Sequence, residues 1–281
     1  MRWAVGGGRV LDTADHTLVM GVLNVTPDSF SDGGKFLAFD AAVAHGLQMR
    51  VDGADIVDVG GESTRPGSDP VPAAEEIDRV VPVIRALVSA GVAVSVDTSK
   101  VEVAAAAIDA GAVIVNDVTA LGDPEMVSLV STAGVGVVLM HLPGTPRTMQ
   151  ADPHYDDVVG EVTAYLLARV EAAQAAGVAP DRIVVDPGIG FGKTLAHNLD
   201  LLTTGVARLA DTGHPVLVGA SRKSFLERVL GPLSPEDRDP PTAVAHAVAI
   251  VAGASIIRVH NVVMGTRCAR VVDAIVRVED I

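Results

Sequence analysis

Hydrophobic and polar positions along the chain repeat one unit. A glycine is followed by a run of mostly β-branched apolar residues, a polar residue, and a stretch with helical spacing of apolar positions. The glycines and the runs that follow them are Gly53 with DIVDVG, Gly91 with VAVSVD, Gly111 with AVIVND, Gly134 with VGVVLMH, Gly177 with RIVVDPG, Gly213 with PVLVGAS and Gly253 with SIIRVH. An eighth apolar run, LVMGVLNV at Leu18–Val25, precedes the series without such a glycine.

Each part of the unit has a physical reason. A glycine just after a helix can adopt the left-handed conformation that ends the last turn, where a Cβ atom would clash. Val and Ile runs without polar alternation are typical of strands buried on both faces of a parallel sheet. Eight such strands alternating with helices predict an α/β fold of the (β/α)8 TIM-barrel type, because eight is the closing number. An open doubly wound sheet is the alternative.

The chain shows no linker and no break in composition, so we expect a single domain over residues 1–281. The segment Trp3–Leu11, around Gly6–Gly8, predicts a short N-terminal hairpin that closes the barrel bottom. Three segments exceed the usual two to six residues of a loop after a barrel strand, namely 26–39, 62–72 and 142–156. Long loops on one rim indicate functional lids, with tolerated insertions as the alternative.

Composition narrows the class of protein. Apolar residues make up 49% of the 281 residues and aromatic residues 3%, so the core is expected to be aliphatic. The formal charge of −14 argues against a nucleic-acid partner but leaves room for a small anionic substrate. The one cysteine excludes an internal disulfide, and no apolar run is long enough for a membrane span. Without a signal-peptide pattern, we expect a cytoplasmic protein with no membrane partner.

Polar residues stand where the expected strands end. They are Asn24, Asp58, Asp97, Asn116, Asp117, His141, Asp186, Ser221, Arg222, Lys223, Arg258 and His260. Any one of them could cap a helix, and Asp58, Asp117 and His141 are candidates for structural roles. Capping explains neither Arg258 with His260 nor Lys223 in the positive first turn of a helix. The set therefore predicts an active site at the C-terminal rim of the barrel.

The rim has an acidic and amide part and a basic part. Asp97, Asn116 and Asp186 suit a flat heterocycle with an amidine-like edge, because a carboxylate can accept two parallel hydrogen bonds. Arg258 and His260 are two residues apart at a strand end, and they suit a phosphate group. This division favours a substrate that combines a nitrogen heterocycle with a phosphate.

Motifs for other ligands are weak or incomplete. Asn24 offers an oxygen to Mg²⁺, which keeps several waters and usually shares substrate phosphates. The segment GIGFGKT at 188–194 looks like a phosphate loop, but Pro187 stands where that motif requires glycine. The histidines and the one cysteine lack the spacings of zinc sites.

Seven segments together resemble the dihydropteroate synthase family. They are MGVLNVTPDSFSDGG (20–34), GGESTRPGS (60–68), VDTSK (96–100), NDV (116–118), DPGIGFGK (186–193), GASRKSF (219–225) and RVH (258–260). They occur in the family's order and span nearly the whole chain. NDV or RVH alone is a weak signal, whereas NVTPDSFSDGG with DPGIGFGK and GASRK is very specific. Two departures are Asn261, where the family often has Asp, and Leu142, where Met or an aromatic residue is expected.

The resemblance implies a transferase of folate biosynthesis. It would join 4-aminobenzoate to (7,8-dihydropterin-6-yl)methyl diphosphate, giving 7,8-dihydropteroate and pyrophosphate by an SN1-like route with Mg²⁺, and it would form a homodimer. The matching positions are Asp97, Asn116, Asp186 and Lys223 for the pterin, Arg258 and His260 for the diphosphate, Phe30, Thr64, Arg65, Pro66 and Ser224 for 4-aminobenzoate, and Asn24 with Asp32 for the metal. The residues expected to act in catalysis are Asp97, Lys223, Arg258 and His260.

Two other functions fit part of these residues. A methyltransferase that binds methyltetrahydrofolate, as in the related corrinoid barrels, would use the same pterin pocket. It leaves the long loop 26–39 and the pair Arg258 and His260 without a role. A paralogue that binds a pterin without synthase activity should have damaged loops or diphosphate ligands, and this chain keeps both.

Overall fold

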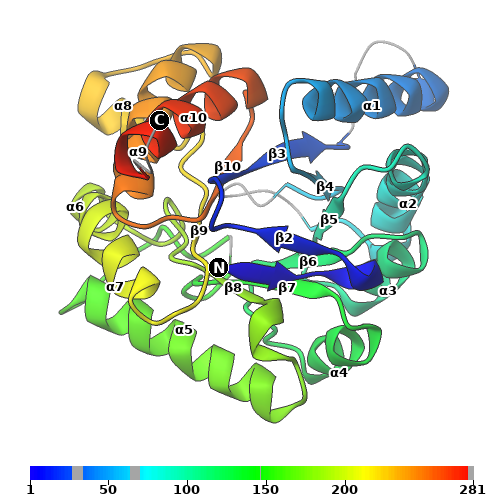
Figure 1. Ribbon diagram of the computed structural model, residues 1–281, viewed down its shortest axis with the longest axis horizontal. Helices are drawn as coiled ribbons and strands as arrows, with labels where there is room; N and C mark the ends of the chain where they lie inside the picture. The colour runs from blue at the N-terminus through cyan, green and yellow to red at the C-terminus, as the bar shows by residue number, and fades with distance from the viewer. Residues whose placement is uncertain (27–33, 64–69, 146, 278–281) are drawn as a thin grey trace.

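The computed structural model describes residues 1–26, 34–63, 70–145 and 147–277, with the backbone alone for residues 34–37. Eight parallel strands form one sheet (Figure 1): β3 (Leu18–Asn24), β4 (Ile56–Gly60), β5 (Val94–Asp97), β6 (Ile114–Asp117), β7 (Gly136–Met140), β8 (Ile183–Asp186), β9 (Leu217–Val218) and β10 (Ile256–Val259). The strand order is β8-β7-β6-β5-β4-β3-β10-β9, and a parallel bridge between Val185 and Val216 joins the two ends. The predicted (β/α)8 barrel is therefore confirmed, and the open sheet is not.

Helices surround the barrel on its outer face (Figure 1). They are α1 (Gly34–Val51), α2 (Ala73–Ser89), α3 (Val101–Asp109), α4 (Pro124–Ala133), α5 (Val158–Ala175), α6 (Leu195–Asp200), α7 (Val206–Ala210), α8 (Phe225–Leu230), α9 (Asp239–Val251) and α10 (Val262–Val276). Short turns of other helix types are η1 (Gly6–Gly8), η3 (Pro180–Arg182), η4 (Leu201–Gly205) and η5 (Glu236–Arg238). Among the helices of the described ranges, none is both long and apolar enough to span a membrane.

The glycines of the repeat adopt the predicted conformation. All seven of them have a positive φ: Gly53, Gly91, Gly111, Gly134, Gly177, Gly213 and Gly253. At Gly111, which follows α3 and has a φ of +103°, a Cβ atom would also lie 2.7 Å from Cγ1 of Val88 on the neighbouring helix α2. Glycine is thus required there both for the backbone turn and for the close approach of the helix.

Successive residues of each strand point alternately into the barrel and out toward the helices. The residues that face inward near the strand starts form one apolar cluster: Leu18, Met20, Ile56, Ile114, Val138, Val184, Leu217 and Ile256. Their neighbours, such as Val57, Val115 and Val185, belong to the larger cluster that packs against the helices. Two residues further along, the inward positions become polar, because Asp58 follows Ile56, Asn116 follows Ile114, Asp186 follows Val184 and Arg258 follows Ile256. The fold therefore places polar groups over an aliphatic floor.

The N-terminal hairpin closes the opposite end of the barrel, as predicted. Its strands β1 (Arg2–Ala4) and β2 (Val10–Asp12) pair antiparallel, and they cross in front of the barrel in Figure 1. Trp3 is fully buried in the same apolar cluster as the inward strand residues. Its indole Nε1 donates a hydrogen bond to the backbone oxygen of Arg182 at 2.9 Å. The hairpin thus fills the barrel bottom with one large side chain.

Replacing this side chain tests its contribution to stability. Trp3→Ala leaves a cavity under the barrel and removes the bond to Arg182, so we expect the free energy of unfolding to fall by about 3–5 kcal/mol. Urea unfolding followed by circular dichroism measures the change. Val10→Ala is the matched control, because Val10 lies in the same hairpin and is 42% exposed. Equal, small losses in both variants would show that the hairpin does not support the barrel.

Candidate functional site

The inward polar residues meet around the guanidinium of Arg258 in β10. Its Nε donates to Oδ2 of Asp58 in β4 at 2.6 Å, and its Nη2 donates to Oδ2 of Asp97 in β5 at 2.7 Å. The same Asp58 oxygen accepts a bond from Nδ2 of Asn116 in β6 at 2.9 Å. Asp58 is fully buried, and Asp97 is 9% exposed. Side chains from four strands therefore form one buried network in the barrel mouth.

The charges of this network do not cancel. Two carboxylates face one guanidinium, so a negative charge remains when both are ionised. Burial raises the pKa of Asp97 to about 7, against the lowering effect of the Arg258 charge. Oδ1 of Asp97 is buried and has no hydrogen-bond partner among the described residues. A buried acceptor of this kind is suited to an N–H group of a ligand or to a cation.

Asp186 places a second carboxylate at the end of β8. Burial raises its pKa to about 6, although the hydrogen bond from the backbone N–H of Gly188 to Oδ1, at 2.7 Å, acts in the opposite direction. Gly188 has a φ of +69°, and a Cβ atom there would lie 2.1 Å from the backbone oxygen of His141. Glycine is therefore required for the turn whose backbone N–H bonds to Oδ1 of Asp186.

Lys223 and Phe191 combine a cation with a flat apolar surface. The Lys223 Nζ lies 3.6 Å from the centroid of the Phe191 ring, a cation–π contact. Its charge also lowers the pKa values of Asp97 and Asp186 against the larger effect of burial, so the ammonium lies near both carboxylates. A Cβ atom at Gly190 would lie 2.9 Å from Cδ of Lys223. Glycine thus lets the lysine stem pass over the turn after β8.

Lys193 supports this turn from below the surface. It is 2% exposed, and its Nζ donates to the backbone oxygen of Phe191 at 2.8 Å and contacts Nδ1 of His141 at 3.1 Å. Burial lowers the pKa of Lys193 to about 7 and the pKa of His141 to about 3. His141 is therefore neutral near pH 7 and serves as a structural partner of the lysine.

His260 lies just after β10, on the rim beside β9. Both its backbone N–H and its Nδ1 lie within hydrogen-bond distance of Ser221 Oγ, at 3.1 and 3.0 Å. Arg258, two residues earlier, uses Nε and Nη2 for the carboxylates. The two basic residues predicted to act together therefore have different surroundings, with Arg258 deeper in the mouth.

Asn24 ends β3 beside a glycine of β4. Asn24 is in register with Gly60, and Gly60 is in register with Asp97 on the other side. A Cβ atom at Gly60 would lie 3.9 Å from Asn24 Oδ1 and 3.8 Å from Asp97 Oδ2. The missing side chain leaves an amide oxygen and a carboxylate facing the same space. No cluster of three or more His, Cys, Asp or Glu side chains suited to a metal occurs within the described ranges.

The structure describes only part of the predicted site. Phe30, Asp32, Thr64, Arg65 and Pro66 lie outside the described residues. Ser224 is described and exposed just before α8, where it lines a small hollow with side chains that include Gln150 and Arg228.

Asp117 has the structural role considered for it. Its carboxylate accepts bonds from the backbone N–H groups of Thr119 and Leu121, at 2.7 and 2.9 Å, and so closes the turn after β6. It therefore belongs to the scaffold of the rim.

Sequence reasoning misses two residues of the site and leaves the role of a third open. The sequence places Asp58 on the rim as a candidate for a structural role, and the structure shows that it binds Arg258 and Asn116 in the barrel mouth. Phe191 and Lys193 lie in the turn after β8, where no strand periodicity indicates the direction of a side chain. Both became visible only from their contacts with Lys223 and His141.

Comparisons with known proteins agree on one family. The model of a family described as pterin binding enzyme matches residues 20–260. The dihydropteroate synthase of Mycobacterium leprae is 51% identical over 264 residues, which cover 91% of this chain and 92% of that protein. A structure of Xanthomonas albilineans dihydropteroate synthase with 4-aminobenzoic acid covers 99% of both chains, with a TM-score of 0.91 and 46% identity. That enzyme in complex with 7,8-dihydropteroate has a TM-score of 0.89 and 44% identity, covering 99% of this chain and 100% of that one.

Asp58 should be a major contributor to the stability of the barrel mouth. Asp58→Ala removes the acceptor of both Arg258 and Asn116 and leaves a buried guanidinium with one carboxylate, so we expect a loss of about 3 kcal/mol in unfolding free energy. Urea unfolding followed by the fluorescence of the one tryptophan measures it. Asp181→Ala, at an exposed aspartate, is the control and should change stability by less than about 0.5 kcal/mol. A similar value for both variants would mean that the ion pair adds no net stability.

Proposed function

This chain belongs to the dihydropteroate synthase family of pterin-binding enzymes, and we propose on that premise how its own residues perform the reaction. The protein condenses (7,8-dihydropterin-6-yl)methyl diphosphate with 4-aminobenzoate, giving 7,8-dihydropteroate and pyrophosphate. The observation that supports this function best is the buried Oδ1 of Asp97, which has no partner among the described residues, in a network where two carboxylates surround one guanidinium. Such a network is suited to a nitrogen heterocycle that offers N–H groups and becomes positively charged during the reaction.

The pterin ring binds between the carboxylates of Asp97 and Asp186 and the ammonium of Lys223. Asp97 and Asp186 accept bonds from its N–H edge, while Asn116 and Lys223 bind the remaining polar atoms. Lys223 already lies on the face of the Phe191 ring. In this proposal the pterin ring packs against the same apolar surface, which Phe191 and the aliphatic stem of Lys223 form. Because Asp186 Oδ1 is used by Gly188, Oδ2 is the oxygen that receives the ligand.

The basic residues bind the diphosphate. His260, fixed by Ser221, donates to it from the rim, and the charge of Arg258 acts from deeper in the barrel mouth. The oxygens of Asn24 and Asp97 fit Mg²⁺, a hard cation that keeps waters and shares substrate phosphates. When bound, the metal supplies positive charge that offsets the charge of the leaving group. Asp32 remains a candidate for a second metal contact.

Charge determines the order of bond changes. The C–O bond to the diphosphate breaks first, and pyrophosphate leaves with the bonding electron pair. The methylene cation is delocalised into the dihydropterin ring, and Asp97 offsets its charge. The amine of 4-aminobenzoate then forms the C–N bond and releases a proton to solvent. A protein nucleophile has no part in this scheme, and Cys268 lies outside the barrel on α10, where its thiol donates to the backbone oxygen of Ala243.

The 4-aminobenzoate site lies at the outer rim. Ser224 lines a hollow there, and Phe30, Thr64, Arg65 and Pro66 complete the site in this proposal. The loops that contain the latter residues follow β3 and β4, the strands that provide Asn24 and Asp58.

Neither alternative function explains the whole rim. A methyltetrahydrofolate-dependent methyltransferase needs no diphosphate, so Ser221 and His260 would have no ligand. A pterin-binding protein without catalysis does not account for the basic pair His260 and Arg258 beside the carboxylates. The relative solved with 7,8-dihydropteroate also favours the synthase.

A reconstituted assay tests the proposal. Purified protein with Mg²⁺, the pterin diphosphate and labelled 4-aminobenzoate should form labelled dihydropteroate, and EDTA should stop the reaction. Asp186→Asn keeps the oxygen that accepts from Gly188 but presents an NH₂ group to the N–H edge of the pterin. Its kcat/KM should fall by about 100-fold, because a donor then faces a donor. Wild-type protein that binds the pterin but forms no product would support the non-catalytic paralogue.

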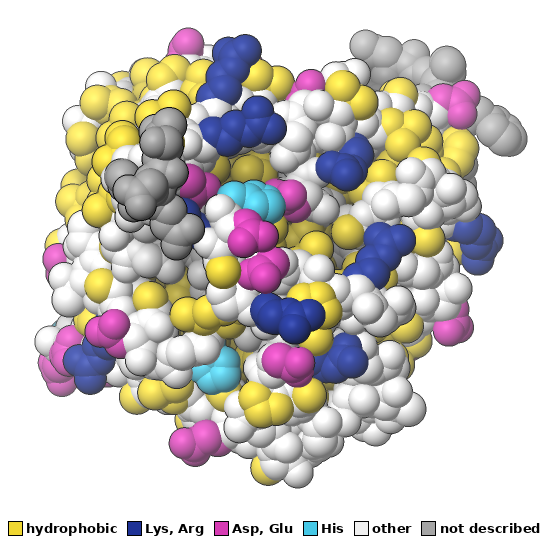
Figure 2. All heavy atoms as spheres, viewed as in Figure 1, with side chains coloured by type: hydrophobic (Ala, Val, Ile, Leu, Met, Phe, Trp, Pro, Cys, Tyr) yellow, Lys and Arg dark blue, Asp and Glu magenta, His cyan; other side chains and the backbone are white. Residues whose placement is uncertain are grey.

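We also propose that two copies of the chain associate through α8, α9 and α10. The outer faces of these helices expose apolar side chains, which gather at the upper left of Figure 2: Val229, Leu230, Val244, Val248, Val251, Val263, Val271 and Ile275. Helices α9 and α10 pack side by side, so their exposed residues form a continuous surface. An apolar patch of this extent is typical of a protein interface, and a two-fold dimer buries the same patch on both copies.

Sedimentation equilibrium tests the dimer. The wild type should have twice the mass of one chain, and Val244→Glu/Val248→Glu should raise the dissociation constant by about 100-fold or more, because charges enter an apolar interface. Val51→Glu is the matched control, since Val51 is 79% exposed on α1 and lies outside the patch. A monomeric wild type, or a double variant that stays dimeric, would contradict this interface.

A further inference from the structure

Arg222 adopts a backbone conformation that is unusual for a residue with a side chain. Its φ is +58°, in the left-handed region. Its backbone N–H donates to Thr242 Oγ1 at 3.1 Å, and its backbone oxygen accepts from Arg238 Nη1 at 3.1 Å. The neighbours on either side are Ser221, which contacts His260, and Lys223, which lies over Phe191. The conformation of Arg222 therefore sets the directions of two rim residues.

The side chain of Arg222 is fixed by a carboxylate of α9. Its Nε donates to Oδ1 of Asp239 at 2.7 Å, and its Nη2 donates to Oδ2 at 2.9 Å. Asp239 is 6% exposed, and its Oδ2 also accepts from Nδ2 of Asn261 at 3.0 Å. Although burial raises the pKa of Asp239, the bonds from Arg222 and Asn261 bring it below its ordinary value. The carboxylate therefore stays ionised, and its two oxygens hold the guanidinium of Arg222 at Nε and at Nη2.

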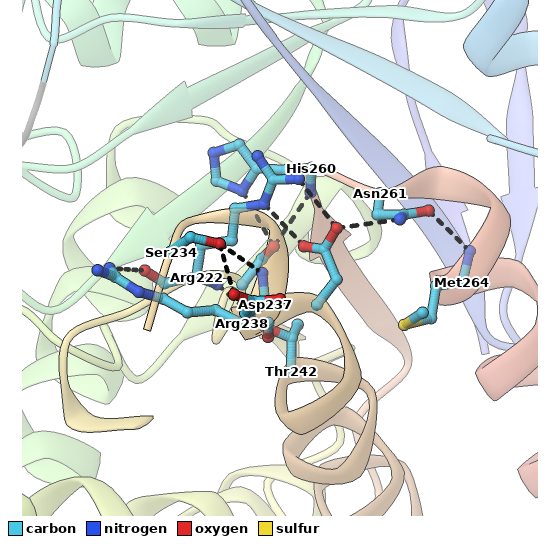
Figure 3. Close-up of polar contacts among 10 residues, drawn as sticks. Arg222, Ser234, Asp237, Arg238, Thr242, His260, Asn261 and Met264 are labelled. Atoms are coloured by element: carbon cyan, nitrogen blue, oxygen red, sulfur yellow. Dashed lines mark hydrogen bonds and ion pairs between the residues drawn. The ribbon is translucent and has the colours of Figure 1, made fainter. Parts of the chain in front are cut away.

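Asn261 connects this pair to the end of β10. It follows His260 directly, and its Oδ1 accepts from the backbone N–H of Met264 at 3.0 Å, which caps α10. Its Nδ2 makes the bond to Asp239 at the same time, and Figure 3 shows Asn261 between His260 and Met264 with its contact to Met264. An amide performs both tasks because it has an acceptor and a donor. An aspartate would cap the helix equally well but would present a second carboxylate to Asp239.

We propose that Asn261 is a positioning residue for the synthase reaction, which acts through Asp239 and Arg222 on the directions of Ser221 and Lys223. The inference rests on the proposed function, because these directions matter only if the rim binds the diphosphate and the pterin. The Ser221 hydroxyl in turn fixes His260, so the chain of contacts starts and ends beside the same histidine. Neither Asn261 nor Arg222 needs to touch the substrate for this role.

Substitutions at one position separate the cap from the contact with Asp239. Asn261→Asp keeps the cap and replaces the donor, so kcat should fall by about tenfold or more, while the KM values of both substrates change by less than about threefold. Asn261→Ala loses the cap as well and should also lower the melting temperature. Arg222→Lys keeps the charge but cannot span both oxygens of Asp239, so it should reproduce the loss in kcat. The kcat of the double variant Asn261→Asp/Arg222→Lys should lie within about twofold of the kcat of the slower single variant, because both changes break the same chain of contacts.

Hydrogen exchange gives a readout that does not depend on activity. In Asn261→Asp, the backbone amides of residues 219–225 should exchange faster, while those of 262–265 at the start of α10 should exchange as in the wild type. If Asn261 acted only as a cap, Asn261→Ala would speed exchange at 262–265 but not at 219–225, and Asn261→Asp would change neither. Wild-type exchange at 219–225 and an unchanged kcat in Asn261→Asp would overturn the inference. A wild-type enzyme that makes no product would instead overturn the proposed function, and the exchange data would still decide the contact.

Discussion

The ion pair of Arg258 with Asp58 and Asp97 is the constraint on which the rest of the site depends. Three ionisable groups leave water here, and burial of charges costs more free energy than a single pair usually returns. The cost is reduced because Asp58 accepts from both Arg258 and Asn116, so its charge is shared by two donors. Asp97 gains less, since its Oδ2 accepts from Arg258 alone, and one oxygen of each carboxylate has no partner among the described residues. The network is therefore stable enough to be fixed but incomplete without a ligand.

The barrel explains why this network can form from residues that are distant in the chain. Inward positions of a strand recur every second residue, and register fixes the height of each one. Gly60 of β4 lies level with both Asn24 and Asp97, so two oxygens approach one space across a residue without a side chain. The aliphatic floor below, closed by Trp3, keeps water from reaching the polar layer from the other end. The barrel therefore both brings the charged groups together and shields them from water at one end.

Much of this arrangement could be predicted from the sequence. The glycines of the repeat and the β-branched runs specified the eight strands, and the polar residues at their ends specified the rim. Asp186 and Asn116 are examples, because each follows an inward apolar residue by two positions. The same patterns do not predict the paths of the turns. The burial of Lys193 and the contact of Phe191 with Lys223 depend on the path of the turn after β8, which has no period that a pattern could reveal.

Asn261 shows the difference between locating a residue and understanding it. The sequence marked it as a departure from the family pattern at a position that binds no ligand. The structure adds that an amide there contacts the N–H of Met264 and the carboxylate of Asp239 at once. A carboxylate at this position would turn an attraction into a repulsion and would have to be offset by Arg222 or by a proton. The identity of residue 261 and the bidentate pair of Arg222 with Asp239 are therefore linked choices, and neither can be judged from the ligand positions alone.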